Sequence, residues 1–317
     1  MADKSRRRRS EKKTAYTVRP DQRSDPKPKT RIARKLAKLP PPKGASSTES
    51  AVRQPDGTSY EDVFALSFRW ADGNMSAIDM KQHDAVIEVM RANGGYATLG
   101  LLYREALKIA GVEWKTKTPF RSINRIVQDN RFFFRIRPGL WALKECKDTL
   151  PAQIKEIEKP EFNHTYYQGL LVELGNLKGF ETFVPPQDRG KKFMEKPLGE
   201  AATVQQLHPF TYPEVVKRAQ SVDVIWFNPR RMPNAFFEVE HTTGFDNSLL
   251  RFVHFQDFNI DFRIVASKDR LKEFTAKIAH PSFAPIAPRI KFTTYELVSD
   301  LHSKAYEVAT LENQWTA

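Results

Sequence analysis

The sequence contains a single cysteine, Cys146, among 317 residues. One thiol excludes an intramolecular disulfide framework and any zinc site built from several cysteines, and it is what a reducing cytosol permits. No apolar run approaches the roughly 18 residues that are needed to span a bilayer. The arginines that follow Met1 are not succeeded by the apolar core of a signal peptide. We therefore expect a cytoplasmic protein without a membrane segment.

Motifs of several common enzyme classes are also missing. The sequence has no Gly-x-Ser-x-Gly elbow, and Cys146 has no convincing histidine partner, which disfavours a serine or cysteine hydrolase. It also lacks the Gly-x-x-x-x-Gly-Lys loop that binds nucleotide phosphates, so any NTP-driven step would need a partner. A composition of 40% hydrophobic and 11% aromatic residues can still fill ordinary cores. At this length we expect two globular units and a tail.

The net charge of +13 is concentrated at the N-terminus. Residues 1–57 hold 17 Lys and Arg residues against six Asp and Glu residues, which leaves +11 there and +2 for the remainder of the chain. Because apolar residues are few, we expect a disordered basic tail. It would serve as a nucleic-acid arm with salt-sensitive phosphate contacts; a solubilising, targeting or assembly segment is the alternative. Residues 58–76 are too apolar for a free linker and form a connecting segment.

Residues 77–148 show the pattern of three helices followed by a hairpin. Thr118 and Pro119 are the strongest helix start, because threonine suits the N-cap and proline the first helical position. Pro138 and Gly139 suit a type II turn between two strands. The expected helices cover 79–93 and 98–110 and begin again at 118, and the expected strands are 132–136 and 140–143.

Three segments of this region carry a family resemblance: Thr118-Pro119, Phe133-Phe134-Arg135 and Pro138-Gly139-Leu140-Trp141-Ala142-Leu143. Together they resemble the HARE-HTH winged-helix domain, which implies a module for duplex DNA or a sensor of modified bases. A winged helix that binds protein is the alternative. Side chains suited to groove edges are Arg121, Asn124, Arg125 and Gln128 on the third helix, and those suited to phosphates are Arg135 and Arg137 on the wing.

A charged linker, 149–162, leads to a second domain, 163–317. The apolar spacing predicts an α/β fold that opens α-β-β-β-α-β, with a mixed sheet and flanking helices. The expected helices are 164–177, 212–219, 247–258, 270–278 and 295–308, and the expected strands are 181–184, 222–227, 235–242, 261–266 and 290–294.

Three carboxylates lie on two of these strands. Asp223 is an acid within an otherwise apolar strand, where an unpartnered charge is costly. The strand period of two places Glu238 and Glu240 on the same face, opposite Phe237 and Val239. Converging carboxylates repel one another unless a cation lies between them, and oxygen ligands select a hard ion, Mg²⁺ or Mn²⁺. The alternative is a solvated strand face whose acids pair with Lys or Arg.

This arrangement resembles the PD-(D/E)xK nuclease superfamily, which has a restriction-endonuclease-like core. Matched residue by residue, Asp223 corresponds to the family's aspartate and Glu238 to the first acid of its third strand. Glu240 stands where the family usually has lysine. Some type II restriction enzymes of the superfamily have glutamate there, acting as a base or a further metal ligand. The resemblance implies catalytic and metal-binding roles for Asp223, Glu238 and Glu240, and the substitution leaves the identity of the general base open.

Five further side chains are weaker candidates for this site. Gln168 and Glu173 lie on the first helix, where family members place another acidic or amide residue, although an exposed helix position is the favoured interpretation for each. Gln256 lies on the expected helix after the third strand, where some family members have glutamine, and an exposed position is again the favoured interpretation. His241 is favoured as a satisfied core histidine over a DNA contact. For Arg251 two interpretations are open: it supplies the positive charge near the phosphate that the family's lysine usually provides, or it is a solvated surface arginine.

These observations together predict a Mg²⁺-dependent DNA endonuclease whose winged helix positions duplex DNA, with a role in restriction of foreign or modified DNA. The alternative is an inactive DNA-binding regulator or assembly subunit that uses the nuclease-like domain as a scaffold. An RNA-associated or capsid-type protein is a third interpretation, based on the basic tail. Nuclease domains of this kind often act as dimers, so a homodimer and an activating protein partner both remain open.

Overall fold

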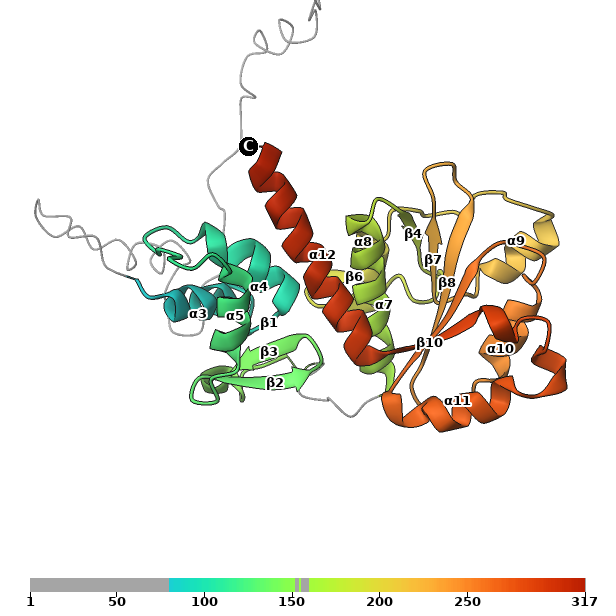
Figure 1. Ribbon diagram of the computed structural model, residues 1–317, viewed down its shortest axis with the longest axis horizontal. Coiled ribbons are helices and arrows are strands. Elements are labelled where there is room, and N and C mark those ends of the chain that lie inside the picture. Colours follow the sequence, from blue (N-terminus) through green and yellow to red (C-terminus); the bar gives the residue numbers. More distant parts are fainter. Residues whose placement is uncertain (1–79, 152–153, 155–159, 317) are drawn as a thin grey trace, which may run out of the picture. The chain divides into compact units, whose positions relative to one another are not determined.

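The computed structural model describes residues 80–151, 154 and 160–316, apart from the side chains of 160–162. The expected basic tail 1–57, the connecting segment 58–76 and part of the linker 149–162 therefore lie outside the described residues. By its internal contacts the chain divides into two units, Met1–Asn74 and Met75–Ala317. The described elements belong to the second unit, and many of them are labelled in Figure 1.

The first elements of this unit are three α-helices and a three-stranded antiparallel sheet. In the sheet, β3 lies between β1 and β2. The expected three helices and hairpin are thus present, whereas the sequence pattern gives no sign of β1. The helices are α3 (Gln82–Ala92), α4 (Leu99–Glu105) and α5 (Pro119–Val127), and the strands are β1 (Tyr96–Thr98), β2 (Phe133–Arg137) and β3 (Leu140–Leu143).

Local chemistry explains where these elements begin and turn. The Thr98 side chain accepts a hydrogen bond from the Leu101 amide at 3.2 Å, which caps α4. Pro119 opens α5, where its missing amide hydrogen costs nothing. Gly139 has φ +74°, the left-handed conformation that a type II turn requires, and it joins β2 to β3. The α4 helix ends at Glu105, earlier than expected, and continues as the 3₁₀ turn η1 (Ala106–Lys108).

A five-stranded mixed sheet forms the centre of the C-terminal part. Strands β4 and β8 run antiparallel to β7, while β9 runs parallel to both β8 and β10. The expected mixed sheet with flanking helices is confirmed. The strands, in their order across the sheet, are β10 (Ile290–Thr294), β9 (Asp261–Ala266), β8 (Pro233–Glu240), β7 (Val224–Phe227) and β4 (Glu181–Phe183).

Helices and short connections complete this part. The segment that the sequence leaves as a polar stretch contains a small hairpin and the short helix α8, and α12 runs to Thr316 instead of ending at Val308. Within the described residues, no helix combines the length and the apolarity that a membrane span requires. The helices are α7 (Pro160–Leu177), α8 (Leu198–Ala201), α9 (Pro213–Ala219), α10 (Asp246–Val253), α11 (Leu271–Ile278) and α12 (Tyr295–Thr316); the hairpin is β5 (Lys192–Phe193) with β6 (Lys196–Pro197); the 3₁₀ turns are η2 (Lys144–Cys146), η3 (Lys268–Arg270), η4 (Pro281–Phe283) and η5 (Ala287–Arg289).

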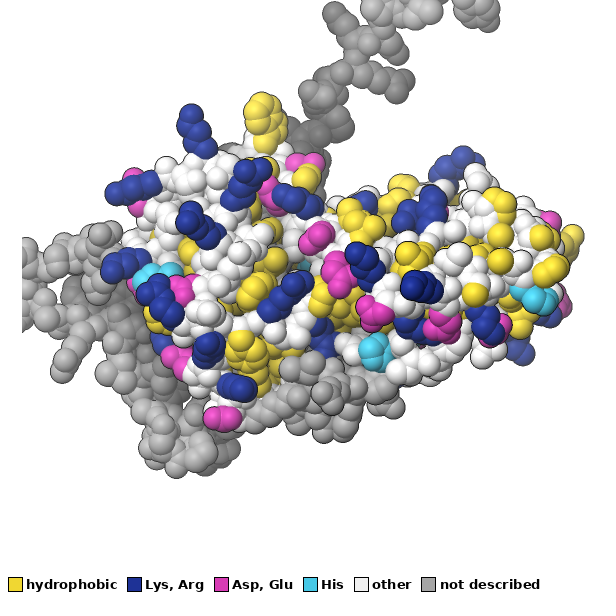
Figure 2. Space-filling model, turned by 60° about the horizontal axis from the view of Figure 1, so that its bottom comes forward, with side chains coloured by type: hydrophobic (Ala, Val, Ile, Leu, Met, Phe, Trp, Pro, Cys, Tyr) yellow, Lys and Arg dark blue, Asp and Glu magenta, His cyan; other side chains and the backbone are white. Residues whose placement is uncertain are grey.

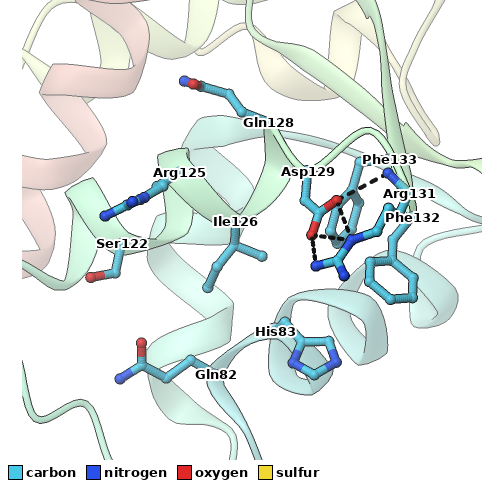
Figure 3. A pocket seen from close by; sticks show the side chains of 10 residues that line it. All are labelled: Gln82, His83, Ser122, Arg125, Ile126, Gln128, Asp129, Arg131, Phe132 and Phe133. Carbon is cyan, nitrogen blue, oxygen red and sulfur yellow. Dashed lines mark hydrogen bonds and ion pairs between the residues drawn. The ribbon is translucent and has the colours of Figure 1, made fainter.

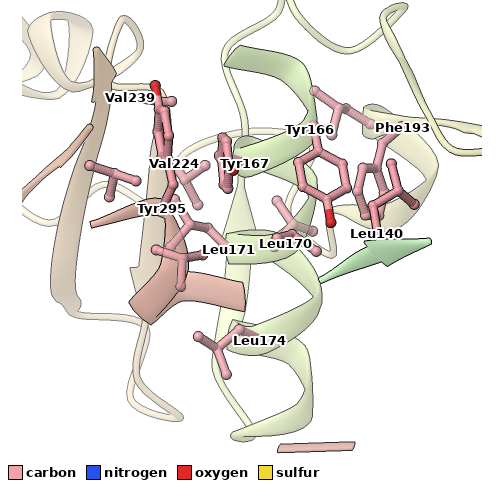
Figure 4. Close-up of a cluster of buried hydrophobic side chains, with 14 of the residues drawn as sticks. Leu140, Tyr166, Tyr167, Leu170, Leu171, Leu174, Phe193, Val224, Val239 and Tyr295 are labelled. Carbon is pink, nitrogen blue, oxygen red and sulfur yellow. The ribbon is translucent and has the colours of Figure 1, made fainter. Parts of the chain in front are cut away.

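Alternating strand residues fill a core on each face of the sheet. Val224 and Trp226 of β7 pack with α7 and the start of α12. Figure 4 shows Val224 in this cluster, with Leu171 of α7 and Tyr295 of α12. Ile225 and Phe227 join the opposite cluster, which includes buried residues of α10. Burying each such side chain stabilises the fold by about 1.5 to 3 kcal/mol. The strands that hold the carboxylates are therefore fixed from both sides.

The hairpin turn between β2 and β3 packs on the C-terminal elements. The carbonyl oxygen of Pro138 accepts hydrogen bonds from the Tyr166 hydroxyl at 3.1 Å and the Ser299 hydroxyl at 2.9 Å. A Cβ added to Gly139 would lie 3.0 Å from the Ser299 side chain. The turn therefore sits against α7 and α12 in close contact.

Candidate functional site

Asp223 directly precedes β7 and is held against the neighbouring strand. Its Oδ2 accepts a hydrogen bond from the Val239 amide at 2.7 Å, which fixes the carboxylate beside β8. The Nε2 atom of His164, on the first turns of α7, lies 3.1 Å from the same oxygen. Burial alone disfavours protonated His164, but the hydrogen bond and charge of Asp223 outweigh this effect and raise the histidine pKa.

Glu238 and Glu240 share one face of β8, as the strand period predicts. The Ser248 hydroxyl on α10 lies 3.3 Å from Glu238 Oε2 and also contacts Glu240 Oε1. Both glutamates are buried, with exposed fractions of 1% and 6%. Helix α10 therefore covers the acidic face of the strand and turns it away from bulk solvent.

The surroundings of the two glutamates disfavour their charged forms. Burial raises the pKa of Glu238 well above its ordinary value, the charge of Asp223 raises it further, and Arg251 opposes the rise through a hydrogen bond of 2.5 Å. Burial likewise raises the pKa of Glu240, against hydrogen bonds from Ser248 and Thr243. Burying carboxylates whose charged forms are disfavoured lowers the stability of the fold, and such carboxylates are typical of functional sites.

A buried amide lies behind Asp223. Gln168 on α7 is fully buried, and its Nε2 donates to the Asp223 carbonyl at 3.1 Å and to Asp188 Oδ2 at 2.9 Å. The favoured expectation of an exposed position is therefore wrong for Gln168. His164 is not among the residues that the sequence pattern indicates. It lies four residues before Gln168 on the same helix face, a spacing that could have pointed to it.

The structure separates two other weak candidates from the carboxylates. Glu173, further along α7, has its Oε2 2.7 Å from His302 Nε2 on α12. Gln256 is exposed beyond the end of α10, and its backbone carbonyl accepts a hydrogen bond from Arg289. Neither side chain is brought to Asp223.

His241 lies at the edge of the site, directly after β8. It is half-buried, which corrects the favoured interpretation as a core histidine. Its Nε2 is 3.2 Å from Asn163 Nδ2, and its Nδ1 is 3.5 Å from the Tyr295 hydroxyl. Burial and the charge of Arg137 lower the pKa of His241. Strand β8 ends here, which explains why the ring is not enclosed.

The third helix presents its polar side as the sequence predicts. Arg121 and Arg125 are exposed on α5, and so is Gln128 directly after its end. Asn124 is half-buried, and its Oδ1 accepts a hydrogen bond from Gln128 Nε2 at 3.2 Å. Arg125 and Gln128 line a groove of about 760 Å³ between α5, the start of α3 and the start of β2. Figure 3 shows the side chains that line this groove. On the face in Figure 2, Lys and Arg side chains are interspersed with Asp and Glu.

The two arginines of β2 have different surroundings. Arg135 is exposed, but Arg137 is only 7% exposed, so it does not lie on the surface with Arg135 as expected. Its guanidinium donates to Asn163 Oδ1 and lies 5.5 Å from the centre of the Tyr166 ring. The pairing of β2 with β3 shifts between these two arginines, and this bulge breaks the alternation that would have put both on one face.

The carboxylates offer oxygen ligands of the kind that a divalent cation binds. Within the described ranges, no group of three or more His, Cys, Asp and Glu side chains is arranged to hold a metal ion. Mg²⁺ commonly takes only one or two protein carboxylates, with water and substrate phosphates as its other ligands. Glu238 Oε1 is buried and has no hydrogen-bond partner among the described residues. The oxygen-only donor set of Asp223 and Glu238 therefore fits a hard cation.

Comparison with known proteins identifies the family. Residues 147–313 match the family of the type II restriction enzyme NmeDI C-terminal domain. The chain belongs to this family. The matched range contains Asp223, Glu238 and Glu240, together with the α7 and α10 residues around them.

One curated relative has the same name as the family. Over 138 residues the chain is 29% identical to the type II restriction enzyme NmeDI of Neisseria meningitidis serogroup C, an alignment that covers 40% of this chain and 39% of that enzyme. The chain thus spans about two fifths of the relative's length. No solved structure matches the chain.

Proposed function

We propose that the protein is a metal-dependent DNA endonuclease of the restriction type, which hydrolyses phosphodiester bonds in duplex DNA. The observation that carries the proposal is that Asp223, half-buried just before β7, lies beside Glu238, which is buried on the neighbouring strand β8. The Oε1 atom of Glu238 has no hydrogen-bond partner among the described residues. Membership of a type II restriction enzyme family supports the same chemistry. Restriction of foreign or modified DNA is the role that these two observations favour.

The proposed site follows the PD-(D/E)xK pattern. Asp223 and Glu238 would hold Mg²⁺ or Mn²⁺, and the bound ion would supply positive charge for the phosphate and an activated water. Glu240, in the position usually held by lysine, would accept the proton of the attacking water, a role suited to a carboxylate with a raised pKa. His164 would hold Asp223 in place through its hydrogen bond.

Residues 77–148 would act as a HARE-HTH-like winged helix, and 163–317 as the nuclease domain, joined by the linker 149–162. The order of α3, β1, α4, α5, β2 and β3 supports this interpretation of the first domain. Helix α5 would enter the major groove and Arg135 would contact a phosphate. Arg137 is excluded from that role by its burial against α7.

A scaffold without catalytic activity is the competing function. It is favoured by the ion pair of Arg251 with Glu238, which fills part of the acidic site with a cation from the chain itself. A scaffold of this kind would still bind DNA through α5. It would neither bind Mn²⁺ at Glu238 nor cleave DNA, and both properties can be measured.

Cleavage of plasmid and long genomic DNA with Mg²⁺ tests the proposal, because long DNA covers many recognition sequences. We expect wild type to cleave, and both Asp223→Asn and Glu238→Gln to lose at least about 100-fold of the rate, the scale of lost electrostatic stabilisation. Glu173→Gln is the matched control, since this carboxylate contacts His302 away from the site. Equal cleavage by all four proteins would overturn the assignment.

A further inference from the structure

The outer side of α12 carries a regular row of exposed apolar residues, called the α12 seam here. With Lys304 included, the positions are separated by four, three, four, three and four residues, the spacing of a coiled-coil seam. Single exposed apolar residues are ordinary on protein surfaces, but a row of this regularity is not. The apolar members and their exposed fractions are Leu297 45%, Leu301 39%, Val308 52%, Leu311 49% and Trp315 90%.

The other side of α12 is already packed. Val298, His302 and Tyr306 are buried and face the body of the unit, where a Cβ added to Gly100 of α4 would lie 2.4 Å from the Tyr306 ring. From Leu311 to Thr316 every residue is exposed. The described residues therefore leave the α12 seam uncovered along its whole length.

We propose that the α12 seam binds the same seam of a second copy of this chain, with the two helices antiparallel. The spacing is symmetric about Tyr306, so antiparallel pairing places Leu301 opposite the partner's Leu311 and Leu297 opposite the partner's Trp315. A two-fold interface needs this kind of self-complementary surface.

Charge favours the antiparallel arrangement, in which like charges meet once, at Glu307 beside the partner's Glu307, and each of these carboxylates has the partner's Lys304 nearby. In a parallel pair, Lys304 would face the partner's Lys304, and Glu307 would lie beside the partner's Glu312, so like charges would meet twice. In the antiparallel pair the Lys304 stem covers the partner's Val308, and its ammonium group comes within reach of the partner's Glu307. The same two side chains already form an ion pair within one helix, at 2.6 Å.

The size of the seam is sufficient for a stable contact. Eighteen residue steps span about 27 Å of helix. Trp315 alone offers about 200 Å² on each copy, against the roughly 1,000 Å² in total that a specific interface buries. Four aliphatic side chains and their polar flanks on each copy supply the remainder. The proposal goes beyond the proposed nuclease function and does not depend on it, although two copies would supply two carboxylate sites.

Sedimentation velocity of the full chain without DNA tests the pairing. We expect wild type to be a dimer at micromolar concentration, and Leu311→Lys to raise its dissociation constant by on the order of 100-fold, because each dimer loses two buried leucines. The matched control is Leu271→Lys on α11, which replaces a leucine of similar exposure, 43%, outside the seam. A monomeric wild type, or a Leu311→Lys dimer as tight as wild type, overturns the proposal and assigns the seam to another occupant.

Crosslinking tests the direction of the helices. In a Cys146→Ser background, a mixture of the Leu301→Cys and Leu311→Cys variants treated with a short bis-maleimide should yield crosslinked dimers. Leu301→Cys alone should remain uncrosslinked, because its two copies lie far apart in an antiparallel pair. Crosslinking of Leu301→Cys with itself, and none in the mixture, would contradict the antiparallel seam.

Discussion

Replacing Glu238 with glutamine should remove a buried charge while preserving the shape of the side chain. The wild-type carboxylate is 1% exposed and lies near Asp223, and one of its oxygens has no hydrogen-bond partner in the part of the chain that the structure describes. The amide oxygen of the variant can still accept the hydrogen bond from Arg251. The Arg251 side chain is 26% exposed, so water can solvate the charge that loses its counter-ion.

The pH dependence of the free energy of unfolding gives the size of the effect expected for Glu238→Gln. The pKa of Glu238 in the folded protein is raised above the unfolded value of about 4.3, so the folded state binds the proton more tightly. The resulting stabilisation is complete below the unfolded pKa and is lost as the pH rises through the folded pKa. The free energy of unfolding therefore changes by at most about 1.4 kcal/mol per pH unit through this one group. Glu238→Gln has no such proton, and its stability relative to wild type should therefore increase with pH.

Urea unfolding followed by circular dichroism, in EDTA between pH 5 and 8, measures this difference. The full chain is used throughout, and Glu214→Gln serves as the control because this glutamate is exposed on α9. We expect the Glu238→Gln curve to diverge from wild type as the pH rises, and the Glu214→Gln curve to follow wild type. Parallel curves for wild type and Glu238→Gln would refute the inference that Glu238 is held in a charge-disfavouring environment.

Three further predictions concern packing and DNA binding. A Cβ at Gly169 would lie 2.1 Å from the Phe193 ring, so Gly169→Ala should lower the free energy of unfolding by about 3 kcal/mol. Gly190→Ala is the control, because a Cβ at that position has no atom within 4 Å, and it should change the free energy of unfolding little. Thermal denaturation measures both variants. Arg125→Ala should leave the melting temperature unchanged, weaken duplex binding and reduce the slope of log affinity against log salt by about one in fluorescence anisotropy. Deleting residues 1–57 should lower duplex affinity and flatten its salt dependence, with an unchanged cleavage rate at saturating protein; loss of cleavage would contradict this.

Local sequence patterns were sufficient for the five strands of the central sheet and for the acidic face of β8. The alternation that puts Glu238 and Glu240 together depends only on the period of a strand, and Ser248 confirms it by contacting both side chains. The expected boundaries of β9 and β10 agree with the structure.

Contacts between distant segments could not be predicted in this way. His164 and Asp223 are 59 residues apart, and their contact depends on how α7 crosses the sheet. Gln168 is of a residue type that is common at surfaces, but it is buried, and its Nε2 donates to Asp188 and to the Asp223 carbonyl. The burial of Arg137 was unexpected for another reason. A bulge in β2 turns its side chain towards Asn163, and no residue type in the sequence indicates that bulge.

Calorimetric titration with Mn²⁺ tests the central claim most directly, because it measures the proposed metal site without requiring a recognition sequence. We expect wild type to bind Mn²⁺ in the absence of DNA, and both Asp223→Asn and Glu238→Gln to lose that binding, while Glu173→Gln retains it. The same heat of binding in wild type and in both site variants would show that these carboxylates do not hold the metal, and would contradict the proposed nuclease site.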